Sequence, residues 1–110
     1  MKKLFFLTVI LVMGITSFAQ TKFRELSWRK AIETAKQEGK MVFVDFYTDW
    51  CGPCKMMAKD VFPQKQVGDY FNMKFVCLKL NAEKEGRELA KRFKVTAYPT
   101  FISSTSRLSL

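Results

Sequence analysis

Residues 42–55 of this 110-residue chain read VFVDFYTDWCGPCK and carry its clearest structural pattern. The first five of them are β-branched or aromatic except for Asp45, which is typical of a strand that is covered on both faces. Cys51 and Cys54 follow this strand in a Cys-x-x-Cys arrangement. A pair of cysteines at this spacing, directly after a strand, is the usual sequence setting of a redox-active dithiol.

The spacing of the two cysteines has a chemical reason. In the first turn of a helix, residues i and i+3 lie close together, so two thiols can form a disulfide without movement of the backbone. A thiolate at a helix N-terminus faces unpaired N–H groups and the positive end of the helix dipole, which lower its pKa. We therefore expect Cys51 to be the attacking thiolate, and Cys54, less exposed, to resolve the mixed disulfide. Pro53 suits the first helical turn because it needs no N–H there, and Gly52 keeps the approach to Cys51 open.

The run of residues 44–55, which ends in Trp-Cys-Gly-Pro-Cys-Lys, resembles the active site of the thioredoxin family. Asp45 stands where that family has a buried acid beneath the dithiol. Lys79 matches the lysine that pairs with this acid, and residues 98–100 match the cis-proline segment that faces the disulfide. The resemblance covers roughly residues 23–102. It implies a thioredoxin-like α/β fold, with a central mixed sheet flanked by helices.

The resemblance also implies chemical roles for the acid and the lysine. A charged carboxylate is costly to bury in an apolar strand, so Asp45 is expected to be either protonated or paired. Asp45 would take the proton from Cys54, through a water, as that thiol attacks the mixed disulfide, with Lys79 as the partner of the acid. The alternatives are an acid that points to solvent at the sheet edge and an ordinary solvated lysine. Asp49 resembles nothing catalytic, and we expect a solvated turn residue there.

Five residues around the dithiol are expected to bind substrate. Trp50, next to the first cysteine, would supply exposed apolar surface. Pro99 is expected in the cis form, which is largely confined to X-Pro bonds in tight turns. Together with Tyr98 it would present backbone groups to an extended substrate segment, in the manner of strand addition. Gly52 and Pro53 complete the predicted substrate-binding set.

Other uses of the cysteines remain open. Zinc needs four ligands, and the sequence has no histidine and only one further cysteine, Cys77. Cu(I) is the more serious alternative because Met56 and Met57 add soft ligands beside the thiols, although methionines at helical spacing more often belong to a core. Cys77 is expected to be a buried structural thiol, with a third redox thiol as the alternative. We predict no metal and no cofactor beyond the redox-active Cys51–Cys54 disulfide.

The first 19 residues have the pattern of a secretory signal peptide. Lys2 and Lys3 precede an apolar segment, and residues 17–19 form a small-x-small cleavage site. The apolar stretch is shorter than the ~20 residues of a membrane span, so we expect no span in the mature chain, with an uncleaved anchor as the alternative. The expected location is the periplasm of a Gram-negative bacterium. This compartment is oxidising, so a reductant there needs an upstream thiol donor.

The length allows one domain. The expected parts are a signal peptide at 1–19, a linker at 20–26, a thioredoxin-like domain at 27–102 and a short polar tail at 103–110. The expected elements are helices at 27–37, 53–61, 64–71 and 81–93, and strands at 41–47, 74–80 and, at its start, 100–102. Ser27 is expected to cap the first helix and Gly39 to end it. Alternating strands and helices favour parallel pairing with helices on both faces. Compared with the family, the last strand and the closing helix are expected to be missing.

The net charge is +9, with 19 basic and 10 acidic residues. The basic residues are scattered and form no stripe with interleaved aromatics, so we expect no nucleic-acid partner. The expected function is that of a thiol–disulfide oxidoreductase that reduces disulfides of exported proteins. Its partners would be those proteins and an upstream thiol reductant. The alternatives are a disulfide oxidase or isomerase, a Cu(I)-handling protein, and an inactive truncated chain.

Overall fold

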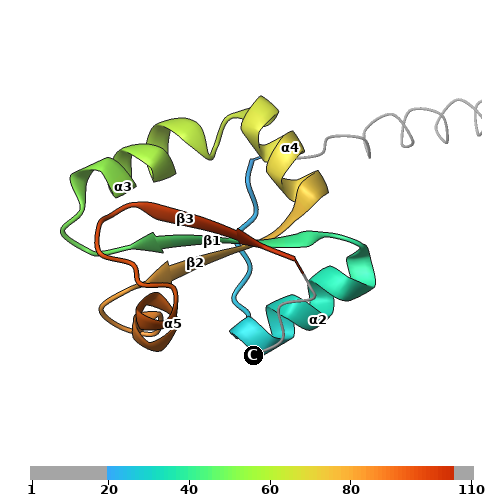
Figure 1. Cartoon of the computed structure of the whole chain (residues 1–110). Coiled ribbons are helices and arrows are strands. Elements are labelled where there is room, and N and C mark those ends of the chain that lie inside the picture. Colours follow the sequence, from blue (N-terminus) through green and yellow to red (C-terminus); the bar gives the residue numbers. More distant parts are fainter. Residues whose placement is uncertain (1–19, 106–110) are drawn as a thin grey trace, which may run out of the picture.

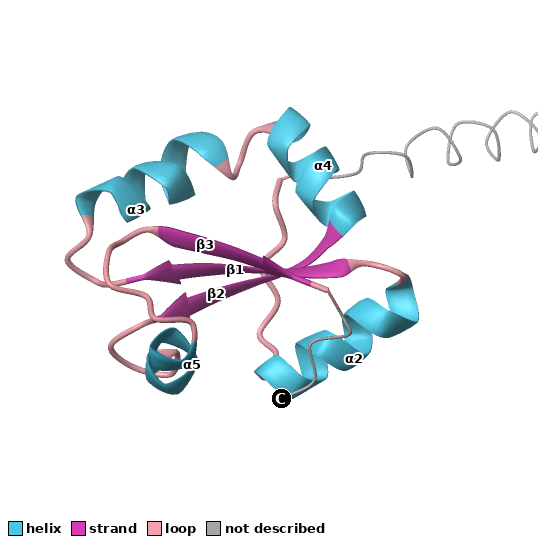
Figure 2. Ribbon diagram, viewed as in Figure 1, coloured by secondary structure: helices cyan, strands magenta, loops and turns pink. Residues whose placement is uncertain are grey.

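The computed structural model describes residues 20–105, in which a mixed three-stranded sheet lies between two layers of helices (Figure 1, Figure 2). The elements in chain order are α2 (Trp28–Glu38), β1 (Met41–Tyr47), α3 (Gly52–Met56), η1 (Met57–Val61), α4 (Lys65–Lys74), β2 (Phe75–Asn81), α5 (Arg87–Arg92) and β3 (Thr100–Ser104). The expected signal peptide and the end of the expected polar tail, residues 106–110, lie outside the described residues.

The sheet has the strand order β2-β1-β3, with β1 at its centre. Strand β2 pairs with β1 in parallel, and β3 pairs with it in the antiparallel direction. The register places Asp45 of β1 between two cross-strand neighbours, Lys79 of β2 and Phe101 of β3. The mixed sheet expected from the family resemblance is therefore confirmed, and it brings the acid and the lysine onto adjacent strands.

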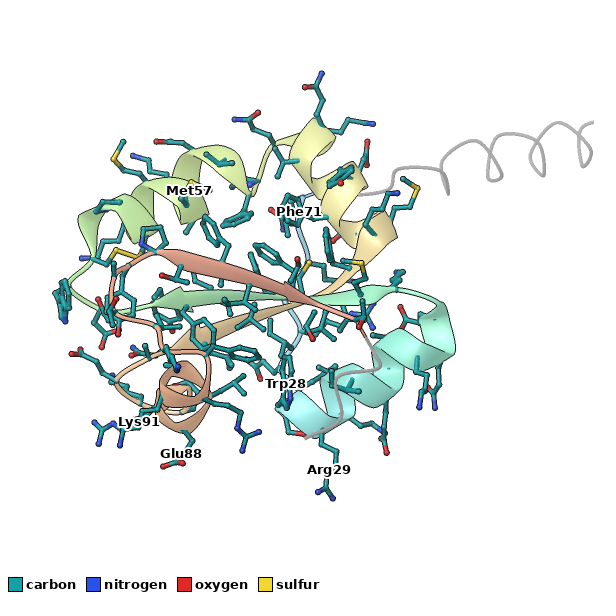
Figure 3. All side chains as sticks on the ribbon, viewed as in Figure 1. Trp28, Arg29, Met57, Phe71, Glu88 and Lys91 are labelled. Atoms are coloured by element: carbon teal, nitrogen blue, oxygen red, sulfur yellow. A yellow bond between two sulfur atoms is a disulfide. The ribbon has the colours of Figure 1, made fainter. Side chains whose placement is uncertain are left out.

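Side chains alternate between the two faces of β1, as they do in any strand. Val44 and Phe46 belong to one buried cluster, on the face covered by α2 and α5, against which Trp28 packs. Phe43 belongs to a second cluster on the opposite face, against which Met57 and the α4 residue Phe71 pack (Figure 3). Asp45, two residues after Phe43, therefore lies on the face that α3 covers.

Several local predictions are confirmed, and their causes are visible. Helix α2 begins after Ser27, whose hydroxyl oxygen accepts a hydrogen bond from the Lys30 N–H at 3.1 Å. It ends at Gly39, whose φ of 66° is left-handed and lets its N–H donate to the Ala35 carbonyl. Strand β1 has the expected bounds. Strand β3 begins at Thr100, as expected, and runs to Ser104, two residues beyond the 100–102 stretch in which it was expected to begin.

The expected helix at 81–93 is wrong in its first half, because only Arg87–Arg92 are helical. Asn81 is the last residue of β2, and a turn at 82–86 follows it. Its side-chain oxygen accepts a hydrogen bond from the Glu83 N–H at 2.9 Å, and its own N–H donates to the Glu85 carboxylate at 2.9 Å. Local bonds of this kind offer the backbone an alternative to helix.

The helix expected at 53–61 is present but changes character halfway. The α-helical part α3 passes into the π-helical turn η1, where the Phe62 N–H donates to the carbonyl of Met57 at 3.0 Å. The segment 20–26, expected as a linker, lies along the domain, and Phe23 forms a parallel bridge with Cys77. Within residues 20–105 no helix is long and apolar enough to span a membrane.

Candidate active site

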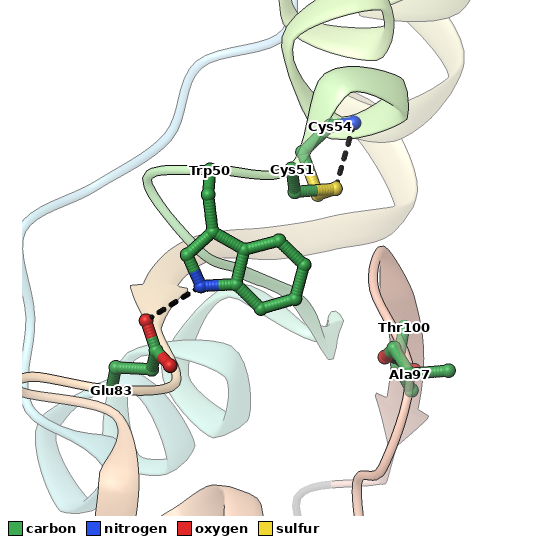
Figure 4. The surroundings of a disulfide bond; sticks show 6 residues. All are labelled: Trp50, Cys51, Cys54, Glu83, Ala97 and Thr100. Carbon is green, nitrogen blue, oxygen red and sulfur yellow. Dashed lines mark hydrogen bonds between the residues drawn. A yellow bond between two sulfur atoms is a disulfide. The ribbon is translucent and has the colours of Figure 1, made fainter.

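Cys51 and Cys54 form a disulfide at the N-terminus of α3 (Figure 4). Their Cα atoms are 5.3 Å apart, within the ordinary range for a disulfide. Cys51 is the N-cap residue in an extended conformation, and its Sγ accepts a hydrogen bond from the Cys54 N–H at 3.1 Å. A sulfur that already accepts a bond at a helix N-terminus is placed where a thiolate would be stabilised.

The expected difference in exposure between the two cysteines is not present in this disulfide form. Cys51 is 3% exposed and Cys54 is 4% exposed. That expectation rests on the helix alone, in which the second cysteine lies one turn deeper. Position in the helix therefore distinguishes the two sulfurs here, because Cys51 is the N-cap residue and Cys54 lies inside the first turn.

Polar contacts fix the loop that leads to the cysteines. Trp50 is 66% exposed, and its indole N–H donates to the Glu83 carboxylate at 2.9 Å (Figure 4). Asp49 accepts a hydrogen bond from the Asn81 side chain at 3.0 Å and forms an ion pair with Lys84 at 2.9 Å. The ion pair and that hydrogen bond hold the pKa of Asp49 below its usual range. The turn after β2 thus holds the turn after β1.

Sequence reasoning missed these partners. Asp49 was expected to be solvated, and although its carboxylate is exposed, it is also tied to the neighbouring loop. One signal was present. The carboxyl ends of parallel strands meet at the same edge of a sheet, so polar residues directly after β1 and β2 must be neighbours.

The Tyr98–Pro99 peptide bond is cis, as expected. The Tyr98 ring lies edge-on to the Trp50 indole, with ring centroids 5.8 Å apart. Ala97 and Thr100, on either side of this dipeptide, are drawn together with the disulfide in Figure 4. Gly52 and Pro53 are exposed at the start of α3. The five predicted substrate-binding residues thus lie in two segments, 50–53 and 98–99, which meet where Tyr98 contacts Trp50.

Asp45 is 2% exposed, so the alternative of a solvent-facing acid at the sheet edge is wrong. Its Oδ1 atom is buried and has no hydrogen-bond partner among the described residues. Burial raises the pKa of Asp45 to about 6, and the positive charge of Lys79 opposes this shift only in part. A carboxyl group with such a pKa can take up and release a proton near neutral pH.

Lys79 lies on the same face as Asp45 but makes no ion pair with it within 4.0 Å. Its ammonium group lies over two aromatic rings instead, 5.0 Å from the centroid of Tyr47 and 6.0 Å from that of Phe23. Lys79 and Cys54 line a common cleft of about 140 Å³, together with Tyr47 and the buried Thr48. The cleft brings the lysine near the second cysteine.

Cys77, Met56 and Met57 are the other sulfur-containing residues that the sequence singled out. Cys77 is free and 1% exposed, in the second core cluster, which agrees with the expected structural thiol. Burial raises its pKa to about 11. Met57 packs against the same cluster, and Met56 is 64% exposed.

The burial and pKa of Cys77 lead to a labelling prediction. After reduction, iodoacetamide at pH 8 should leave Cys77 unmodified in the folded protein and modify it in denaturant, because a buried neutral thiol is a poor nucleophile. Peptide mass spectrometry after both treatments measures this. Labelling of Cys77 in the folded protein at the rate of Cys51 would contradict the assignment.

Two cysteines held in this way can pass between disulfide and dithiol with little movement of the backbone, which places the chain in the class of dithiol–disulfide domains. The sequence model of the thioredoxin family matches residues 20–107. The chain belongs to the thioredoxin family.

Individual proteins agree with this assignment. Thioredoxin-1 of Drosophila melanogaster is 40% identical over 75 residues, which are 68% of this chain and 64% of that protein. A protein of Bacteroides thetaiotaomicron described as a disulphide-isomerase has a solution structure with a TM-score of 0.71 and 48% identity, covering 83% of this chain and 76% of that one. The solution structure of a Thermus thermophilus thioredoxin has a TM-score of 0.65 and 30% identity, covering 74% of this chain and 63% of that one. The matched region spans less than two thirds of the Drosophila protein.

Proposed function

We propose that the chain is a thiol–disulfide oxidoreductase that reduces disulfides of exported proteins through Cys51 and Cys54. The observation that carries this proposal is the Cys51–Cys54 disulfide at a helix N-terminus, with an N–H group already directed at the Cys51 sulfur. The Gly-Pro pair between the cysteines resembles that of reductive thioredoxins and favours reduction over oxidation.

The reaction starts from the dithiol form. The Cys51 thiolate attacks one sulfur of a substrate disulfide, a mixed disulfide forms, and the other substrate sulfur leaves as a thiolate. Cys54 then loses its proton and attacks the Cys51 sulfur, which releases the second substrate sulfur and forms the Cys51–Cys54 disulfide. Two electrons pass to the substrate, and an upstream thiol reductant must return two electrons to the protein.

Asp45 is the proposed acceptor of the Cys54 proton. Its pKa of about 6 leaves it mostly ionised at neutral pH, and its Oδ1 atom has no competing hydrogen-bond partner among the described residues. It lies on the face of β1 that the helix α3 covers, and Cys54 belongs to that helix. Returning the same proton would let Asp45 serve the reverse reaction as an acid.

Substrates would dock on the apolar surface beside the disulfide. The exposed Trp50 indole and the Tyr98 ring are in edge-to-face contact, and Glu83 fixes the orientation of the indole. The backbone at Tyr98 and Pro99 would pair with an extended substrate segment. Export to the periplasm is proposed from the pattern of residues 1–19.

A disulfide isomerase is the second candidate. The observation that favours it is the 48% identity to the Bacteroides thetaiotaomicron protein, for which a disulphide-isomerase function has been proposed. The two functions use the same cysteines and differ in the stability of the disulfide relative to the dithiol. The reduction potential therefore separates them.

The deciding measurement is the reduction potential of the Cys51–Cys54 pair. The purified protein is equilibrated in graded glutathione buffers, alkylated, and analysed by mass. A potential near about −270 mV is expected for a thioredoxin-like reductant. A potential near about −180 mV would favour the isomerase, and one near about −120 mV would mean that the protein donates disulfides instead.

A further inference from the structure

Lys79 and Asp45 are register partners on adjacent parallel strands, yet the lysine does not use the acid as its partner. Side chains at paired positions of neighbouring strands point to the same face, so a contact between them is geometrically accessible. The carboxylate is buried with one oxygen unpartnered, so an ion pair with Lys79 would give that oxygen a partner. The contacts that the ammonium group makes in place of this ion pair are therefore of interest.

The Lys79 ammonium group lies over two aromatic rings. Tyr47 lies two residues after Asp45 on β1 and presents its ring to the Lys79 ammonium group at 5.0 Å. Phe23, in the segment that bridges to β2, lies at 6.0 Å on the same group. Both distances fall in the range of cation–π attraction, which strengthens when the cation is partly removed from water, as the half-buried Lys79 is.

We propose that Tyr47, assisted by Phe23, is a positioning residue for Lys79: the two rings hold the lysine ammonium group beside them and out of ion-pair contact with Asp45. The inference deepens the proposed function and rests on it in one respect, the assignment of Asp45 as the proton acceptor. A carboxylate in a close ion pair has a lowered pKa and is a weak base. A carboxylate whose positive neighbour lies farther away keeps a higher pKa and can take a proton from a thiol.

Other charged groups near Lys79 do not explain its position. The charged residues lining the two clefts that Lys79 shares with Tyr47 are Arg24, Glu25, Asp49, Lys55 and Glu85. Arg24 is bound by Glu38, Asp49 by Lys84, and Glu85 by the Asn81 N–H. Glu25 and Lys55 are exposed and form no ion pair within the described residues. The aromatic rings are therefore the contacts that define where the ammonium group lies.

The test is a titration of the Asp45 side-chain carboxyl carbon by NMR in the disulfide form. We expect Tyr47→Leu to lower the pKa of Asp45 by about one unit or more, because the released lysine can approach the carboxylate. Tyr47→Phe keeps the ring and should leave the pKa near that of the unmodified protein. Phe23→Leu, which removes the more distant ring, should give a smaller shift in the same direction.

The control is the same titration with Lys79 replaced by Met. In the Lys79→Met protein, Tyr47→Leu should no longer change the pKa of Asp45, because the shift depends on the lysine. An equal shift in both backgrounds would overturn the proposal, since it would show that loss of the ring merely lets water reach the acid. An unchanged pKa in both Tyr47→Leu and Phe23→Leu would also overturn it.

This titration measures the pKa of Asp45 directly and involves no thiol exchange. If the Asp45 pKa responds as expected but Asp45→Asn leaves resolution of the mixed disulfide unaffected, the positioning role stands and the proposed proton transfer is wrong. If resolution of the mixed disulfide depends on Asp45 but Tyr47→Leu leaves the pKa of Asp45 unchanged, the proposed function stands and the positioning role is wrong.

Discussion

Replacing Cys51 with serine is expected to reduce the rate of substrate disulfide reduction to that of the uncatalysed reaction. A serine hydroxyl does not ionise near neutral pH, so the N–H group that Cys54 directs at position 51 has no thiolate to stabilise. The matched variant, Cys54→Ser, should still attack substrates but should stop at the mixed disulfide on Cys51. Non-reducing gels and mass spectrometry of the two variants with a disulfide-containing protein measure both outcomes.

Cys77 supplies the control for these two variants. Because it is buried in a core cluster and lies outside the disulfide, Cys77→Ala should retain the exchange rate of the unmodified protein, although a small loss of stability is expected from the smaller side chain. Exchange through Cys51 is excluded if Cys54→Ser traps no substrate, or if the trapped substrate is attached to Cys77.

The parts of the fold that local chemistry dictates could be predicted from the sequence. Strand β1 is bounded by its apolar run, and α2 by the Ser27 cap and the left-handed Gly39. The helix expected from residue 81 begins only at Arg87, because Asn81 makes hydrogen bonds with Glu83 and Glu85 that compete with helix formation. Residue type alone does not reveal which of several possible local bonds an asparagine makes, since the outcome depends on the strand that precedes it.

In the candidate site, too, the features set by short motifs could be predicted, whereas contacts between distant residues could not. The dithiol and the cis-proline follow from short motifs, whose geometry is set within a few residues. The hydrogen bond from Trp50 to Glu83 joins residues 33 positions apart, and it exists because β1 and β2 end at the same edge of the sheet. The Asp45–Lys79 neighbourhood was predicted through family resemblance, but the lysine's position over Tyr47 depends on side-chain packing that a sequence motif does not encode.

Replacing Asp45 with asparagine is expected to make the protein more stable and less active. Asp45 has a folded-state pKa of about 6, above its ordinary value of 3.8. Between these values the folded state binds more protons than the unfolded state, so the free energy of unfolding falls as the pH rises through this window and stays low above it. The shift of about two units corresponds to an order of magnitude of about 3 kcal/mol at pH 7. Urea denaturation at pH 4 and pH 7 should therefore show that Asp45→Asn stabilises the protein at pH 7 by roughly 1 to 3 kcal/mol, with little gain at pH 4.

The same variant should slow the second step of exchange. An amide cannot accept the Cys54 proton, and a general base typically contributes about 10²-fold or more to the step that it assists. Formation of the mixed disulfide by Cys51 should change much less, because Asp45 takes no part in it. Rapid-mixing kinetics with acid quenching separates the two steps. Asp60→Asn is the matched control, since it makes the same chemical change at an exposed carboxylate that forms no ion pair within the described residues. Equal slowing of both steps in Asp45→Asn would contradict the assigned role of Asp45 in the second step.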